Sequence, residues 1–550
     1  MSIQFGFLES LLKFDTFQFH LLLISSLHIL CWGYCLTIKG WCSDDIQGLA
    51  QFSDHFIQHK DAQGNITKEE KVDTYETSNK DKDGKPIRIK MTAWPGYLGW
   101  PSCFMRWFRL NWGRNFKEIG KNQNGHKIYG YVQDGRKHHL LNLIVQWVNL
   151  VLGYNLLAYL FTPQVALVAM LLFATHPCGV QTVGWISGVN YLISLMFALL
   201  SFNLVLYTHN PYITLPLVAL FTLCSCGTLM HGIFNFVILL MMHQYNEALI
   251  AGLVGVYMLA TLGKWSINFR FKAFEEQAMG KSTKFYWNKL IIMVKTFWYY
   301  VKLVLFPKRM GLFHTWGYHF EEPLEHVDRQ FWLGLASLIA YFGLIFVSPF
   351  VVQFGLIWAF CYMLIFSNVV TANQLVSERY VFFSMFGLSL AVANILQGFP
   401  IFVAFLLGIY VMRVWVHLPT FINEVRFYES NLFNFPDSEV AMGNLGVAYL
   451  NHGLHHKSMD TWLEASRQNT LYDVPWYNLY QICKQNGDLN GAFRFLTFCL
   501  KAKTIHFKEQ WVKEMEDLKR FMSIQGSPQD FAKKLNQSIK EGNYDRAGAI

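Results

Sequence analysis

The sequence predicts an all-α protein with a polytopic membrane domain and a C-terminal domain of tetratricopeptide repeats. Of its 550 residues 53% are hydrophobic and only 15% are charged. Many apolar runs approach the ~20 residues that a helix needs to cross a bilayer. After residue 420 the composition becomes polar, and a pattern of small residues recurs with a spacing of 34 residues. We therefore expect a membrane domain at 1–420 and a repeat domain at 421–550.

The apolar runs predict about eleven transmembrane helices. No small-residue cleavage site follows the first of them, so we expect it to remain as an anchor. The expected crossings are 19–38, 140–160, 163–176, 185–207, 212–229, 230–245, 247–263, 331–348, 350–369, 381–397 and 399–417.

An odd number of crossings places the two ends of the chain on opposite sides of the membrane. The longer connections then share one face with the C-terminal domain. The segments on that face are 39–139, 176–185, the turn near 230, 264–330, 370–380 and everything after 418. The stretch 285–306 is apolar but carries three lysines, which favours an amphipathic helix in the interface.

The large loop at 39–139 has features of its own. Turn signals at 61–65 and 82–86 lie between short alternating stretches and predict β-hairpins. An aromatic-rich stretch at 94–114 suits the headgroup layer, where it would anchor the loop or touch the substrate.

The C-terminal domain shows the spacing of tetratricopeptide repeats. Small residues at helix crossings let each helix pair pack closely on the next. The recurring pairs are Asn444 and Asn478, Leu445 and Leu479, Gly446 and Tyr480, Gly453 and Gly487, Ser458 and Ala492, and Ala465 and Cys499. The segment 541–550 partly matches the pattern and is the candidate for a third, degenerate repeat. An array of two or three repeats suits docking or capping better than a long peptide groove, and we expect it to bind a protein acceptor or a partner subunit.

Charge and cysteine content narrow the functional classes. The formal charge of +9 suggests anionic lipid or phosphate partners, and no nucleic-acid-binding motif is present. The ten cysteines form no CxxC pair or disulfide framework. A transporter or channel needs ionisable residues within the spans, and these spans are almost free of them.

Two short segments carry the candidate chemistry. Asp44 and Asp45 follow the first apolar run, and a carboxylate at the membrane boundary suits a general base; a pair that caps a helix is the alternative. Arg379 lies beside Glu378, which would orient it, and a guanidinium binds phosphate through paired donors. Additional phosphate contacts are expected from the sequence-adjacent pair Lys308 and Arg309, unless these serve only as interfacial anchors.

Histidines are frequent on the same predicted face. A His–Asp cluster would suit a divalent cation, but no ligand spacing such as HExxH is present, and hydrogen-bonding or helix-end roles are favoured. The histidines concerned are His138, His139, His176, His231, His314 and His319.

An ordered set of motifs carries a family resemblance. The motifs are SDDIQG at 43–48, WPSCFMRWFRLNW at 100–112, KHHLLNLIVQWVNLVLGYNLL at 137–157, HPCGVQTVGWISGVNYLISLMF at 176–197, VKLVLFPKRMGLFH at 301–314 and SERYVFFSMFGLSL at 377–390. Together with the repeats, they resemble the transmembrane and tetratricopeptide-repeat O-mannosyltransferase-like glycosyltransferases of the GT-C superfamily. The chain is similar to a divergent, bacterial-type member.

The resemblance implies transfer of a sugar from a polyisoprenyl-phosphate donor to a protein or glycan acceptor on the extracytoplasmic face. It maps an acidic pair onto Asp44 and Asp45, and an acidic-Arg-Tyr element onto Glu378, Arg379 and Tyr380. His139 and His176 are expected to support this site. The chain departs from the family pattern at Trp100-Pro101, at Cys226-Gly227-Thr228 and at Gln181, where relatives carry an acidic residue.

The sequence leaves alternatives for the orientation of the chain in the membrane and for its catalytic activity. Lys and Arg are concentrated in the loops assigned outside, which by the positive-inside tendency would be cytoplasmic, although long loops escape that rule. We follow the resemblance and expect an integral protein of a bacterial inner membrane or a secretory-pathway membrane, with the repeats extracytoplasmic. The alternative function is a non-catalytic membrane scaffold or accessory subunit built on a degenerate glycosyltransferase fold.

Overall fold

A computed structural model describes the chain in two compact units. The first contains the described residues up to Asn423 apart from His314, and the second contains His314 and those from Glu424 onward. The described residues are 16–42, 54–60, 66–72, 108–121, 127–208, 210–266, 285–312, 314, 327–367, 376–468, 473–501 and 508–525.

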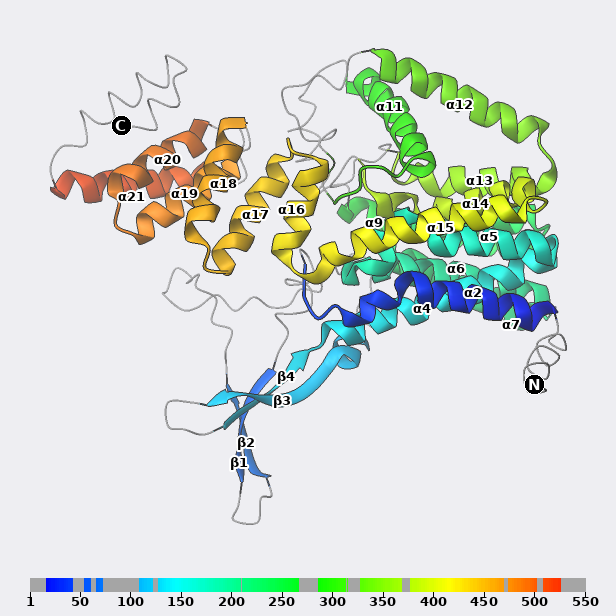
Figure 1. Cartoon of the computed structure of the whole chain (residues 1–550), viewed down its shortest axis with the longest axis horizontal. Coiled ribbons are helices and arrows are strands. Elements are labelled where there is room, and N and C mark those ends of the chain that lie inside the picture. Colours follow the sequence, from blue (N-terminus) through cyan, green and yellow to red (C-terminus); the bar gives the residue numbers. More distant parts are fainter. Residues whose placement is uncertain are drawn as a thin grey trace, which may run out of the picture. The chain divides into compact units, whose positions relative to one another are not determined.

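The first unit is built mainly from apolar helices (Figure 1). Its α-helices are α2 (Thr16–Trp32), α4 (Gly135–Leu160), α5 (Pro163–Thr175), α6 (Val189–Tyr207), α7 (Pro211–Thr228), α8 (Asn235–Met241), α9 (Tyr245–Ser266), α11 (Phe285–Leu305), α12 (Arg329–Val347), α13 (Phe350–Leu364), α14 (Phe382–Leu396) and α15 (Pro400–His417). Short turns of other helix types are η1 (Gly33–Thr37), η4 (Pro177–Gly179), η5 (Val180–Gly184), η6 (Ile186–Gly188), η7 (Met230–Phe234), η10 (Glu378–Val381) and η11 (Leu418–Ile422).

Several of these helices have the length and composition of membrane spans, which confirms the predicted membrane character. Within the described residues seven helices are long and apolar enough, and a bent pair at 163–184 raises the number to eight. The expected segments at 230–245, 247–263 and 350–369 are also helical, but the apolar helices found there are shorter: Met230–Met241, Tyr245–Thr261 and Phe350–Leu364. α13 has 15 residues. At 1.5 Å per residue such a helix is about 22 Å long, shorter than the ~30 Å hydrocarbon core.

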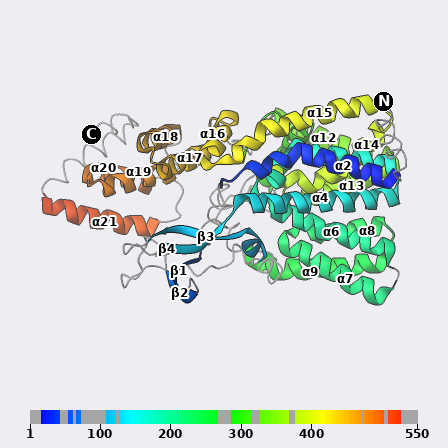
Figure 2. The ribbon, with the colours of Figure 1, turned by 60° about the horizontal axis from the view of Figure 1, so that its bottom comes forward.

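The long helices lie side by side, as the two views of the ribbon agree (Figures 1 and 2). Their core is aromatic: the Trp358 ring on α13 stacks on Phe386 of α14 with centroids 4.6 Å apart, and its indole N–H donates to the Phe383 carbonyl at 3.0 Å. Gly355 and Gly387 face each other where these helices cross, and a Cβ on either would clash with the other's carbonyl. Small residues thus allow the close approach, as is usual between membrane helices.

The lysine-bearing stretch 285–306 forms α11, which packs against α12. Lys295 is buried in this pair, and its ammonium lies 2.9 Å from the Asp328 carboxylate at the start of α12. The same carboxyl group accepts from the Phe331 N–H and so caps α12. One of the three lysines is therefore an internal partner, and the interfacial position of α11 stays a prediction.

The large loop contributes a four-stranded antiparallel sheet with strand order β2-β1-β4-β3. Its strands are β1 (Asp54–Lys60), β2 (Ile66–Val72), β3 (Arg114–Lys121) and β4 (Lys127–Gln133). β1 and β2 pair around residues 61–65, which confirms the hairpin predicted there. The β3–β4 hairpin was not predicted, and the segment 82–86 lies outside the described residues.

The second unit consists of consecutive short helices that pack as antiparallel neighbours. They are α16 (Glu424–Asn434), α17 (Glu439–Asn451), α18 (His455–Gln468), α19 (Asp473–Gln485), α20 (Leu489–Lys501) and α21 (Lys508–Gln525). α17 and α19 start and end 34 positions apart, and α18 and α20 start 34 positions apart. Both turns use a glycine with positive φ, 74° at Gly453 and 76° at Gly487. The second helix pair therefore repeats the backbone of the first. The segment 541–550 lies outside the described residues.

Candidate functional site

The candidate site lies at the end of the helical unit where α5 breaks. α5 and the segment Pro177–Gly184 form a pair bent by 56°, and η5 within it is a π-helical turn. From Thr175 to Gly188 every residue except Ser187 is buried. Irregular backbone at such depth needs partners for its polar groups, and π-helical turns are frequent at functional sites.

Side chains from neighbouring elements supply those partners. The Asn142 amide on α4 donates to the carbonyls of Val183 and Trp185, at 3.2 and 2.9 Å. His176 accepts from the Cys178 N–H at 3.2 Å through Nδ1, and its Nε2 lies 3.1 Å from the Val304 carbonyl. His176 thus caps the break and ties it to α11, which is a structural role at the edge of the site.

Glu378 is fully buried, and its carboxylate binds residues from two other segments. Oε1 accepts from the Gly311 N–H at 2.9 Å, and Oε2 accepts from the Gln181 side-chain amide. Gln181 also donates to the Gly311 carbonyl at 2.9 Å and accepts from the Ser377 hydroxyl at 2.6 Å. We call Gln181, Gly311, Ser377 and Glu378 the buried polar cluster. It joins η5, the end of the segment after α11, and the start of η10.

Arg379 lies between aromatic rings. The guanidinium carbon is 5.4 Å from the centroid of Trp185 and 5.1 Å from that of Tyr380, and Tyr191 on α6 shares a side-chain hydrogen bond with it. Tyr380 is stacked on Phe366, with centroids 3.9 Å apart and the rings 1° from parallel. Arg379 is half-buried, its Nη1 has almost no exposed surface, and the flanking rings restrict the guanidinium.

Lys308 and Arg309 are exposed and follow the end of α11. Arg413 on α15 donates to the carbonyls of Pro307 and Lys308, at 2.8 and 2.7 Å, and so fixes the backbone that presents them. The charges of both Arg309 and Glu378 act on Tyr299 of α11. The structure therefore brings the basic pair to the same end of the bundle as Arg379.

Asp44 and Asp45 lie outside the described residues, but the chain just before them is placed. Cys42 donates its thiol to the Phe421 carbonyl at 3.2 Å, and its own carbonyl accepts from the Trp185 indole at 3.3 Å. The ring of Trp185 also contacts the Arg379 guanidinium. The segment leading to the predicted base thus begins beside the predicted phosphate ligand.

The remaining histidines do not assemble into a ligand set. His138 shares a hydrogen bond of 3.0 Å with Gln133, and His139, which was expected to support the site, is buried on α4 with neither ring nitrogen hydrogen-bonded. His231 stacks on Phe383, and His314 contacts Phe435 within the second unit. In the described part of the chain no group of three or more His, Cys, Asp or Glu could hold a metal ion, and His319 lies outside that part.

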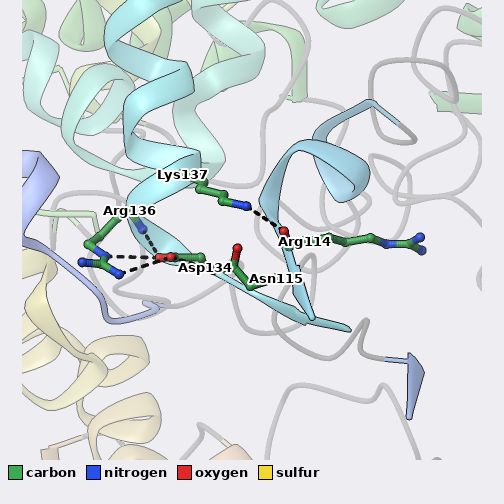
Figure 3. Close-up of polar contacts among 5 residues, drawn as sticks. All are labelled: Arg114, Asn115, Asp134, Arg136 and Lys137. Carbon is green, nitrogen blue, oxygen red and sulfur yellow. Dashed lines mark hydrogen bonds and ion pairs between the residues drawn. The ribbon is translucent and has the colours of Figure 1, made fainter. Parts of the chain in front are cut away.

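Three basic residues, Arg114, Arg136 and Lys137, lie near the start of α4, where β3 and β4 meet the helix (Figure 3). Asp134 caps the helix by accepting from the Arg136 N–H at 3.0 Å, while Lys137 donates to the Arg114 carbonyl at 2.7 Å. Burial of Asp134 acts to raise its pKa, but hydrogen bonds from Arg136 and Asn115 outweigh this and hold the pKa below 3.8. The guanidinium of Arg114 points away from this contact.

Several residues at the site were not recognised from the sequence, namely Trp185, Tyr191, Gly311 and Ser377. Gln181 was noted only as a departure from the family pattern. The available signal was a run of polar residues and glycines inside an apolar segment at 176–188. Comparison of the chain with protein-family models, with curated proteins and with solved structures finds no match.

Proposed function

We propose that this chain is a membrane glycosyltransferase that moves a sugar from a polyisoprenyl-phosphate donor to a protein or glycan acceptor. One observation carries the proposal: the segments that bear the resemblance converge at one end of the helical unit. Gln181 binds Gly311 and Glu378, and Trp185 binds Cys42 and contacts Arg379. These positions are far apart in sequence, so their meeting supports a common role.

The proposed reaction divides the work between two kinds of residue. Asp44 or Asp45 takes the proton from the acceptor hydroxyl, whose oxygen forms the bond to the anomeric carbon. The bond from that carbon to the donor phosphate breaks, and the lipid phosphate leaves with the electron pair. Arg379, helped by Lys308 and Arg309, stabilises the developing negative charge.

The wider organisation belongs to the same proposal. The short apolar helices would cross with the seven long ones to give about eleven crossings of a GT-C-like domain. The helix pairs of the second unit would be tetratricopeptide repeats that bind the protein acceptor or a partner subunit, on the extracytoplasmic side of a bacterial inner membrane or a secretory-pathway membrane. The 34-residue recurrence of helix starts supports this assignment.

A non-catalytic scaffold is the second candidate, and the buried polar cluster favours it. Both carboxylate oxygens of Glu378 accept hydrogen bonds within the protein, from Gln181 and from the Gly311 backbone, as those of a purely structural carboxylate would. The two candidates differ in whether acidic residues near Cys42 matter for turnover.

The deciding experiment uses the full chain in vesicles with a polyisoprenyl-phosphate mannose and a Ser/Thr-containing acceptor peptide. Mass spectrometry of the peptide should detect transfer, and Asp44→Asn or Asp45→Asn should reduce the rate by roughly 100-fold or more, the usual contribution of a general base. Asp134→Asn, which keeps a capping oxygen outside the proposed site, is the matched control. Transfer that persists in both single variants and in the double variant would remove the base assignment, and absence of transfer over a panel of donors would favour the scaffold.

A further inference from the structure

The side-chain amide of Gln181 is placed where two acceptors and one donor converge. Its Nε2 faces the Gly311 carbonyl and a Glu378 carboxylate oxygen, and its Oε1 faces the Ser377 hydroxyl. Both partners of Nε2 accept hydrogen bonds only, which fixes the orientation of the amide. The three hydrogen bonds of this side chain therefore match the donor and acceptor atoms of an amide.

Gly311 is held by both of its backbone groups. Its carbonyl accepts from Gln181 at 2.9 Å, and its N–H donates to Glu378 at 2.9 Å. Gly311 closes a short segment in which Lys308 and Arg309 are the charged residues, while Glu378 is the immediate neighbour of Arg379. One amide and one carboxylate thus connect the two cationic segments.

We propose that Gln181 is a positioning residue: with Glu378 it locks the backbone at Gly311 and so holds the Lys308–Arg309 segment beside Arg379. The lock is a property of the described contacts alone, whereas its effect on the lipid donor rests on the proposed function. A glutamate at position 181 has the same size but cannot donate when it is ionised. It would face Glu378 as a second carboxyl group, and because burial and the like charge both raise the pKa of such a pair, the two share a proton below that raised pKa and repel each other above it.

Because the buried polar cluster is shielded from water, the lock should be sensitive to the Gln181→Glu substitution. Ser377 and Glu378 have no exposed surface, and Gln181 is 4% exposed, so water cannot replace a lost bond cheaply. Titratable groups of the described residues whose charges act with Glu378 include Cys178 of η4, Tyr299 of α11 and His417 of α15. None of these lies in the cluster itself.

The direct test measures hydrogen exchange at the Gly311 amide in the full chain by mass spectrometry of peptides that span 307–312. In Gln181→Glu at alkaline pH, where both carboxyl groups are ionised, exchange corrected for the intrinsic rate should be faster by roughly tenfold, the effect of losing about one hydrogen bond. Protection should return as the pH is lowered and the carboxylates share a proton. The double variant Gln181→Glu with Glu378→Gln, which again pairs one amide with one carboxylate, should recover part of the protection at the same alkaline pH.

Two further variants keep the result decisive. Gln181→Met removes the hydrogen bonds without adding charge, so it should lose protection at every pH, and it serves if the glutamate variant does not fold. Gln397→Glu adds the same charge at an exposed position between α14 and α15 and should leave the Gly311 amide unchanged. Unchanged protection of Gly311 in both position-181 variants would overturn the proposal.

A measurement of lipid-phosphate affinity tests the proposed function separately from the backbone lock at Gly311. Undecaprenyl monophosphate in detergent is the probe, and its dissociation constant should rise roughly tenfold in Gln181→Glu at alkaline pH, where both carboxyl groups are ionised, and recover in the double variant. In turnover, KM for the donor should rise more than kcat falls, because the lock positions the phosphate ligands and not the base. Faster exchange at Gly311 with unchanged lipid-phosphate affinity would leave the lock intact and contradict the placement of the donor phosphate.

Discussion

The guanidinium of Arg379, the proposed phosphate ligand, is held by its neighbours before any ligand arrives. Trp185 and Tyr380 flank it at 5.4 and 5.1 Å, and Tyr191 shares a hydrogen bond with it. Contact with ring faces restricts the planar group without neutralising its charge. The entropy of ordering the side chain has thus been lost in the folded protein, which leaves more of the phosphate interaction for binding.

Replacement of Arg379 should therefore weaken use of the donor. A paired guanidinium–phosphate contact in a partly dry site contributes on the order of 2–4 kcal/mol, so Arg379→Ala should weaken donor use by roughly ten- to a thousandfold. Arg379→Lys should recover only part, because it keeps the charge but loses the planar fork. The measurement is transfer rate against donor concentration.

The control for this series is Arg467→Ala, because Arg467 is an exposed arginine on α18 in the second unit, where it forms an ion pair with Glu464 at 3.7 Å. Thermal stability is recorded for every variant. An Arg379→Ala protein that is less stable but kinetically normal per folded molecule would make Arg379 a structural partner within η10.

At the scale of elements, the chain depends on well-defined helix ends. α4 begins at a side-chain cap, α5 ends at a histidine cap, and the helix pairs of the second unit end in glycines with positive φ. Capping satisfies N–H and C=O groups that lack partners within a helix. These ends are where single substitutions should affect whole elements.

The cap of α4 makes a prediction with a pH dependence. Asp134→Ala should cost about 1 kcal/mol at neutral pH, the usual value for an N-cap, while Asp134→Asn keeps an acceptor and should cost less. Because the folded-state pKa of Asp134 is depressed below 3.8, its stabilisation is present above that pH and is lost as the pH falls through the folded pKa. Thermal unfolding in detergent should thus show the wild type and Asp134→Ala approaching each other below pH 3.8. A difference that stays constant with pH would assign the effect to packing and not to the charged cap.

The glycine turns of the second unit make another prediction. Gly487→Ala should destabilise the α19–α20 pair by roughly 1 kcal/mol, because alanine is strained at a positive φ although nothing lies within 4 Å of the added carbon. Gly487→Asn should cost less, since asparagine adopts this conformation more readily. Hydrogen exchange of α19 and α20 in the full chain measures both, and Gly453 should behave in the same way. Equal losses for alanine and asparagine would mean that φ is not the cause.

The elements were also where sequence reasoning was most successful. The apolar runs located the helices, the turn at 61–65 located the β1–β2 hairpin, and the 34-residue spacing located repeated helix starts. Each of these signals is local. The buried polar cluster was not predicted, because Gln181 and Glu378 are 197 positions apart and no local pattern specifies their pairing. Gln181 was understood as a missing acid, whereas the structure uses its amide as a donor.

At the scale of the whole molecule, the connections divide between the two ends of the helical unit. Cys42, η5, Gly311, η10 and η11 meet at one end. The short turns after α6 and α14 belong to the opposite end of those helices. If the chain has the proposed function, the segments that meet at this end would form its reaction surface.

This arrangement predicts the membrane topology. Cysteines introduced at Asn210 and Gln397, in two short turns, should both be protected from a membrane-impermeant thiol reagent in intact cells and react after permeabilisation. A cysteine at Asp437, between α16 and α17, should react without permeabilisation if the second unit is extracytoplasmic. All three positions are exposed, and the nine native cysteines of the described residues are buried; the tenth, Cys103, is replaced by serine in the background of this experiment. Reaction at Asn210 and Gln397 with protection of Asp437 would place the second unit in the cytoplasm. Reaction at only one of the two short turns would show that an odd number of the shorter helices between them fails to cross, because α7 and the helices up to α14 must together return the chain to the same side.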